Sequence, residues 1–140
     1  MQTIEDITAD FEYLDDWEDR YRYLIELGRA LPPMPDGSQT EESKVRGCAS
    51  QVWLVSESDT ANPPHLTFLG DSDAHIVRGL VAVALALFSG KTAPEILEAD
   101  AEATFLRLGL KDHLSPQRSN GLRSMVARIK DDARQALAAA

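Results

Sequence analysis

The chain has a single cysteine, Cys48, among its 140 residues. One thiol cannot form a disulfide within the chain, nor cycle between dithiol and disulfide. It also cannot supply the several thiolates that an iron–sulfur cluster takes from its protein. The only imidazoles are His65, His75 and His113, and none has C-x-x-C or H-x-x-x-H spacing to another ligand. The sequence therefore predicts no metal and no cofactor on this chain.

Long apolar runs are also missing. The longest apolar region, 76–88, is interrupted by Arg78 and Gly79, and it is shorter than the roughly 20 residues a spanning helix needs. The first residues, "MQTIEDITADF", lack the basic and then apolar segments of a secretory signal. Together with the unpaired cysteine, these features predict a cytoplasmic protein without a membrane partner.

Positive charge is scarce. Lys and Arg number 14 against 23 Asp and Glu, which gives a formal net charge of -9. An acidic surface repels phosphate backbones and anionic lipids, so we expect neither nucleic acid nor membrane as a partner. A protein partner with a basic patch is compatible with this charge. The length predicts a single domain over residues 1–140.

Periodicity and turn signals predict two helices at the start of the chain. Thr3 is expected to cap the first, over 4–14, and Asp15 and Glu18 have capping-box spacing at the start of the second. Pro32 and Pro33 end that second helix. Four more helices are predicted later in the chain. The first lies between Asp71 and Gly90, the second over 92–99, the third over 102–108, and the fourth starts at Ser115.

Between these groups of helices, residues rich in β-forming side chains predict three short strands, at 44–46, 51–56 and 65–69. Their short connections favour an antiparallel sheet. Strands and helices are segregated along the chain. The expected fold class is therefore α+β, a compact single domain with a small three-stranded antiparallel sheet packed against helices.

Cys48 lies in the stretch "KVRGCASQVWL", at the turn between the first two predicted strands. Gly47 beside it indicates an unusual backbone angle or a close approach by another group. Lys44 and Arg46 are cations that would favour thiolate over thiol. A free cysteine is also often a buried small apolar residue, so the local sequence leaves both interpretations open.

The chemistry open to one thiol is limited. A Cys–His nucleophile remains possible, because such pairs meet in space rather than in sequence. Thiol–disulfide exchange and persulfide transfer need only one nucleophilic cysteine and a partner protein.

Three further residues are candidates for supporting roles. Ser50 can hydrogen-bond the backbone of the turn. Asp73 is either the N-cap of the following helix or a contact of the cysteine loop. Arg118 is either a charge at the start of the last helix or a residue that holds the loop or engages a partner. His75 and His113 are interpreted as structural.

The stretch around Cys48 resembles the V-x-G-C-x-S-x-V-W motif of the SufE family of cysteine-desulfuration proteins. Three other stretches resemble that family in the same order: "WEDRYRYLIELGRALP", "GDSDAHIVRGLVAVALALFSGKT" and "LGLKDHLSPQRSNGLRSMV". Ala49 departs from the pattern, since many members carry Gln at that position.

The resemblance implies a compact α+β fold shared with scaffold proteins of the IscU type. It implies a sulfur carrier that accepts persulfide sulfur on Cys48 from a pyridoxal-phosphate (PLP) cysteine desulfurase of the SufS or CsdA type. The carrier would stimulate that enzyme and deliver sulfur to an iron–sulfur scaffold. PLP is expected on the partner, and this chain is expected to be an accessory protein, a monomer or weak homodimer, rather than an enzyme.

Overall fold

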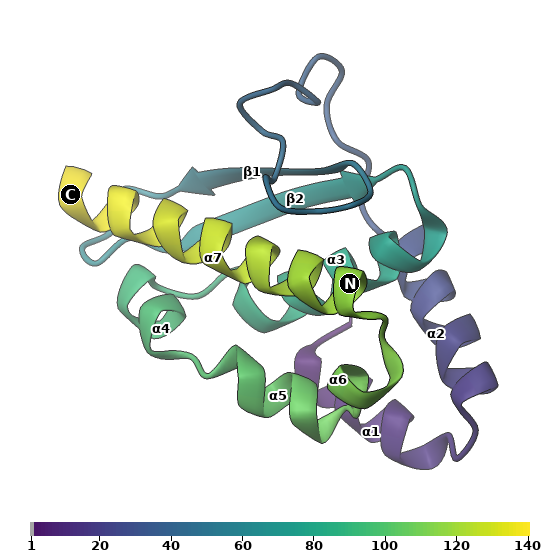
Figure 1. Ribbon diagram of the computed structural model, residues 1–140. Helices are drawn as coiled ribbons and strands as arrows, with labels where there is room; N and C mark the ends of the chain where they lie inside the picture. Colours follow the sequence, from purple (N-terminus) through teal and green to yellow (C-terminus); the bar gives the residue numbers. More distant parts are fainter. Residues whose placement is uncertain (1) are drawn as a thin grey trace.

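In the computed structural model, which describes residues 2–140, two strands lie along one side of the molecule and helices pack beneath them (Figure 1). The helices and strands are α1 (Ile4–Tyr13), α2 (Trp17–Arg29), β1 (Val52–Ser58), β2 (Leu66–Ser72), α3 (His75–Phe88), α4 (Ala93–Glu98), α5 (Ala101–Arg107), α6 (Leu110–His113) and α7 (Pro116–Ala139). The predicted α+β class is confirmed. The short helix α6 was not predicted.

The sheet has two strands in the described chain, and the prediction of three is wrong. β1 and β2 are antiparallel, with Val52 opposite Ser72 and Ser58 opposite Leu66. The predicted strand at 44–46 makes only an isolated bridge between Lys44 and Trp53. The pairing does not continue beyond the bond from the Val45 amide to the Val52 carbonyl oxygen, and the chain turns at Gly47, whose φ is +88°.

Alternate residues of both strands point into the core, as the period of two requires. The inward-facing members include Val52 and Leu54 on β1 and Leu66 and Phe68 on β2, all buried. α3 packs against this face, and eleven of its fourteen residues are buried. This confirms the prediction of a helix buried on most sides. α3 is the central helix, and the sheet, α1, α2 and α7 all pack against it.

The starts of the helices follow the sequence signals with two exceptions. Thr3 and Asp6 form the capping box of α1, and Ser115 accepts from the backbone of Arg118 at the start of α7. The expected box at Asp15 is wrong, because Asp16 caps α2 by accepting from the Glu18 amide at 3.0 Å. The second exception is α3, where Ser72 and Asp73 hydrogen-bond Gln51 of the neighbouring loop and Asp71 pairs with Arg78.

Candidate functional site

Cys48 lies on the connection between α2 and β1, in a turn that follows Gly47. We call residues 44–51 the cysteine loop. Gly47 adopts the left-handed conformation that the turn requires, and a Cβ on it would come within 2.6 Å of the Ser124 hydroxyl of α7. Both features expected of this glycine, the backbone angle and the close approach, are present, and the approaching group belongs to the same chain.

The thiol faces α7 and is half-buried. Its Sγ donates to the carbonyl oxygen of Gly121 at 3.6 Å. Burial raises the pKa of the Cys48 thiol, so the side chain in this position is held protonated. This shift is opposite to the one expected from Lys44 and Arg46, and the Arg46 guanidinium is instead paired with Glu41 at 3.1 Å.

Beside the thiol lies a cavity of about 330 Å³. It is bounded by the cysteine loop, α3 and the first turns of α7, and its lining residues are Cys48, Ala49, Ser50, Val77, Leu80, Ser115, Gln117, Arg118, Gly121 and Met125. Its floor is apolar, and its polar lining comes from the loop and from the start of α7. The cavity thus gives the thiol a partly dry environment with room beside it for a small added group.

The downstream end of the loop is tied to the junction of β2 and α3. Asp73 Oδ1 accepts from the Gln51 amide at 3.1 Å, and the Asp73 amide donates to the Gln51 carbonyl oxygen at 3.3 Å. Ser72 Oγ also donates to that carbonyl oxygen, at 2.7 Å. The N-cap of α3 is Ala74, which makes no side-chain cap. Of the two roles considered for Asp73, the structure therefore has the loop contact.

The structure brings together only part of the predicted set. Cys48, Ser50 and Arg118 line the cavity, and Asp73 fixes the loop at its edge, whereas the side chain of Arg46 turns toward Glu41. No local signal in the sequence indicates that Gly121, a glycine on one face of a long helix, accepts from the thiol. The contact between Gly121 and the Cys48 thiol depends on how α7 packs against the loop.

No histidine lines the cavity within the described residues 2–140. His113 stacks on Trp17 with a centroid separation of 3.9 Å, and His65 pairs with Asp59 at 2.9 Å. In the same part of the chain, no three His, Cys, Asp or Glu side chains are grouped as metal ligands would be. No described helix is long and apolar enough to cross a membrane.

Comparison with known proteins identifies the family of this chain. The model of the SufE family, described as an Fe-S metabolism associated domain, matches residues 5–133. This chain belongs to the SufE family. A SufE-like protein of Rhizobium meliloti is 60% identical over 134 residues, with 95% of this chain and 96% of that protein covered. A SufE-like protein of Rhizobium etli is 57% identical, with coverages of 99% and 95%. Both carry the description "uncharacterized".

The fold of this SufE-family chain also matches a solved structure. A hypothetical protein from Thermus thermophilus, determined in solution, has a TM-score of 0.77 and 20% identity, with 96% of both chains covered. At that identity the likeness establishes the fold alone. Family membership associates the protein with iron–sulfur metabolism.

The cysteine loop of this SufE-family protein is expected to separate from α7 more often when Gly47 is replaced by alanine. The left-handed conformation costs a non-glycine residue about 1–2 kcal/mol, a population change of roughly five- to thirtyfold. The alkylation rate of Cys48 by iodoacetamide, followed by intact mass, should rise by that factor. Overlap of the new Cβ with the Ser124 hydroxyl is a second possible cause of loop release. A Gly47→Ala/Ser124→Ala double variant separates the two, since it relieves this overlap and retains the backbone strain. An unchanged rate in both would contradict this account of the turn.

Proposed function

We propose that this protein accepts persulfide sulfur on Cys48 from a PLP-dependent cysteine desulfurase, stimulates that enzyme, and delivers the sulfur for iron–sulfur cluster assembly. The observation that carries the proposal is the placement of the only thiol in the chain. It lies on a glycine turn, over a cavity, in a member of a family associated with iron–sulfur metabolism.

The transfer is a displacement at sulfur. The Cys48 thiolate attacks the outer sulfur of the partner's persulfide and forms a new S–S bond with it. The bond between that sulfur and the partner's cysteine breaks, and the partner's cysteine leaves as a thiolate. The outer sulfur keeps its proton if it had one, so the products are a Cys48 persulfide and a free partner thiolate, with no net oxidant or reductant.

The cavity supports both states of such a carrier. At rest, the raised pKa of the buried thiol keeps Cys48 protonated and weakly nucleophilic. After transfer, the space beside Sγ accommodates one more sulfur over the apolar side chains of Val77, Leu80 and Met125. In this proposal the loop leaves α7 for the attack, because Sγ is half-buried and donates to the Gly121 carbonyl oxygen.

The proposed partner is a desulfurase of the SufS or CsdA type, which carries the PLP. The carrier itself needs no cofactor and acts as an accessory protein in the cytoplasm, as a monomer or weak homodimer. Arg118 and Ser50 line the cavity, and we assign Arg118 a contact with the partner or the loop and Ser50 the support of the turn. The net charge of -9 suits a docking surface with a basic patch on the desulfurase.

The decisive experiment is an intact-mass measurement after incubation with a PLP cysteine desulfurase and L-cysteine. The expected product carries one additional sulfur atom on Cys48, and a reductant removes it. Absence of that adduct would refute the carrier role. Turnover of a small substrate without any partner would instead indicate a self-contained cysteine enzyme, and full stimulation by Cys48→Ala would indicate an adaptor that needs no thiol.

A further inference from the structure

The upstream half of the cysteine loop runs along one face of α7 in the opposite direction. The thiol of Cys48 donates to Gly121, and Gly47 packs on Ser124. Further along the helix, Nη1 of Arg128 donates to the carbonyl oxygen of Lys44 at 3.4 Å. Positions 121, 124 and 128 are spaced i, i+3 and i+7, so they share one face of the helix. This face is the seat of the loop.

Arg128 is the charged member of that face. Its Nε pairs with Asp132, one turn further along α7, at 3.2 Å, and the two side chains are only 28% and 13% exposed. A guanidinium has donors in a fixed fork, so it can pair with the carboxylate and the loop carbonyl oxygen together. The pair with Asp132 therefore fixes the direction in which Arg128 presents its Nη1 to the loop.

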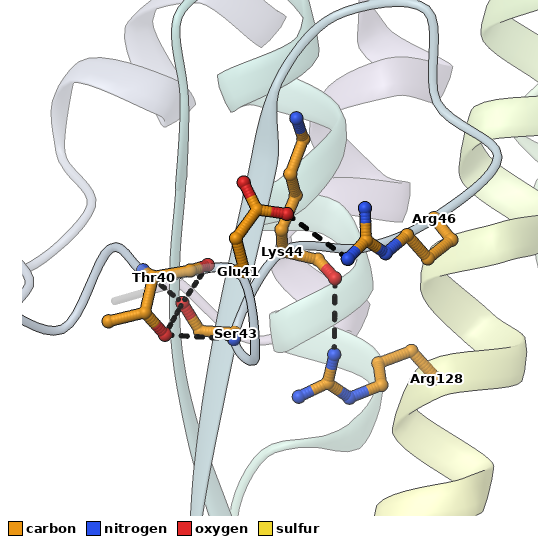
Figure 2. Close-up of polar contacts among 6 residues, drawn as sticks. All are labelled: Thr40, Glu41, Ser43, Lys44, Arg46 and Arg128. Atoms are coloured by element: carbon orange, nitrogen blue, oxygen red, sulfur yellow. Dashed lines mark hydrogen bonds and ion pairs between the residues drawn. The ribbon is translucent and has the colours of Figure 1, made fainter.

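The Lys44 carbonyl oxygen is itself presented by an ordered turn (Figure 2). Ser43 is buried, and its Oγ accepts from the Thr40 amide at 2.9 Å and donates to the Ser38 carbonyl oxygen at 2.6 Å. The Lys44 amide donates to the Thr40 carbonyl oxygen at 3.0 Å. In Figure 2 the Lys44 side chain points away from Arg128 while its carbonyl oxygen points toward it. Arg128 thus contacts backbone at the point where the ordered turn ends and the cysteine loop begins.

We propose that Arg128 is a positioning residue for Cys48, which holds the upstream end of the cysteine loop on α7 and thereby sets how often the thiol leaves its cavity. The position of the loop follows from the contacts above, and the consequence for sulfur transfer rests on the proposed function. The downstream end is held separately by Asp73 and Ser72. Loss of Arg128 therefore frees one end of the loop and leaves the other attached.

The test uses the full chain and the variant Arg128→Met, which keeps an unbranched apolar stem and removes every donor. The alkylation rate of Cys48 by iodoacetamide is expected to rise roughly three- to tenfold, the population change that one ordinary hydrogen bond supports, because the contact to the Lys44 carbonyl oxygen is long at 3.4 Å. The midpoint of its pH profile should fall toward the ordinary thiol pKa, because a released thiol is hydrated. A smaller free energy of unfolding would not move that midpoint as long as the unfolded chain remains rare, and urea denaturation checks this condition. Arg128→Lys, which keeps a charged donor, should restore part of the slow rate.

The matched control is Arg134→Met. Arg134 also lies on α7 and pairs with a carboxylate of the same helix, Asp131, at 2.7 Å, and within residues 2–140 it makes no hydrogen bond or ion pair with the loop. Cys48 in Arg134→Met should be alkylated at the wild-type rate. A wild-type rate and an unmoved midpoint in Arg128→Met would overturn the proposal.

Stimulation of the desulfurase gives the second readout. If the loop must leave α7 to reach the partner, the concentration of Arg128→Met needed for half-maximal stimulation should fall by the factor seen in alkylation, with the maximal rate unchanged. Faster alkylation with an unchanged half-maximal concentration would overturn the role in transfer. If wild type gains no sulfur adduct, the proposed function fails, and the alkylation rates still decide whether Arg128 positions the loop.

Discussion

Replacement of Cys48 by serine is expected to abolish sulfur acceptance completely while leaving the free energy of unfolding within about 1 kcal/mol of the wild-type value. A serine hydroxyl is not ionised near neutral pH and cannot attack a persulfide. It can, however, donate to the Gly121 carbonyl oxygen that the thiol contacts at 3.6 Å, so the loop keeps its seat. Intact mass after incubation with desulfurase and L-cysteine measures the first effect, and urea denaturation measures the second.

The same variant has a signature in the pH dependence of stability. Because burial raises the pKa of Cys48, the folded chain binds the thiol proton more tightly than the unfolded chain. Wild-type stability should therefore decline as the pH rises above the ordinary thiol pKa of about 8.5, and Cys48→Ser should lack this contribution. Burial and the Asp10 carboxylate also raise the pKa of Tyr23, but both chains share that residue, so its effect cancels in the comparison. Equal pH dependence in the two chains would contradict a buried thiol.

Gly79→Ala is expected to be the most destabilising single substitution considered for this fold, by about 3 kcal/mol or more. A Cβ at Gly79 would overlap the Leu24 carbonyl oxygen and lie 2.6 Å from its carbonyl carbon. The obstacle is backbone of α2, which cannot rotate away as a side chain would. α2 and α3 would have to separate, and both helices contribute to the core under the sheet. The midpoint and slope of urea denaturation give the change in free energy of unfolding.

Gly37→Ala is the control for that substitution. Gly37 has a φ of +80°, and an added Cβ there meets nothing within 4 Å, so the change costs only backbone strain of about 1–2 kcal/mol. A loss of stability in Gly79→Ala no larger than in Gly37→Ala would show that the two helices can adjust without cost.

Local sequence signals predict the helices well where a cap and an apolar stripe coincide. Thr92 and Glu95 form the capping box of α4, and Ser115 followed by Pro116 starts α7. α6 has four residues, too short for a periodic pattern to emerge. The third strand was overpredicted because β-forming residues at 44–46 indicate an extended chain and not how long its pairing with β1 lasts.

The residues of the candidate site likewise fall into those that local sequence reveals and those that depend on packing. Cys48 and Gly47 were evident from the sequence because a lone thiol and a turn glycine are local features. The roles of Gly121, Ser124 and Arg128 were not, since they depend on the packing of a helix more than seventy residues later against the loop. Burial raises the pKa of the Cys48 thiol and so acts against the influence expected from Lys44 and Arg46. Nearness in sequence did not bring the Arg46 guanidinium to the thiol, because Glu41 pairs with it.

The seat on α7 makes the spacing of that helix more important than the identity of most of its residues. Each residue of an α-helix is rotated by about 100° from the one before, so inserting or deleting a single residue between 121 and 128 would turn one contact point away from the others. The loop could then meet Gly121 or Arg128 but not both. Exposed positions within this segment can exchange side chains freely, whereas a change of its length would separate the contact at the thiol from the contact at the start of the loop.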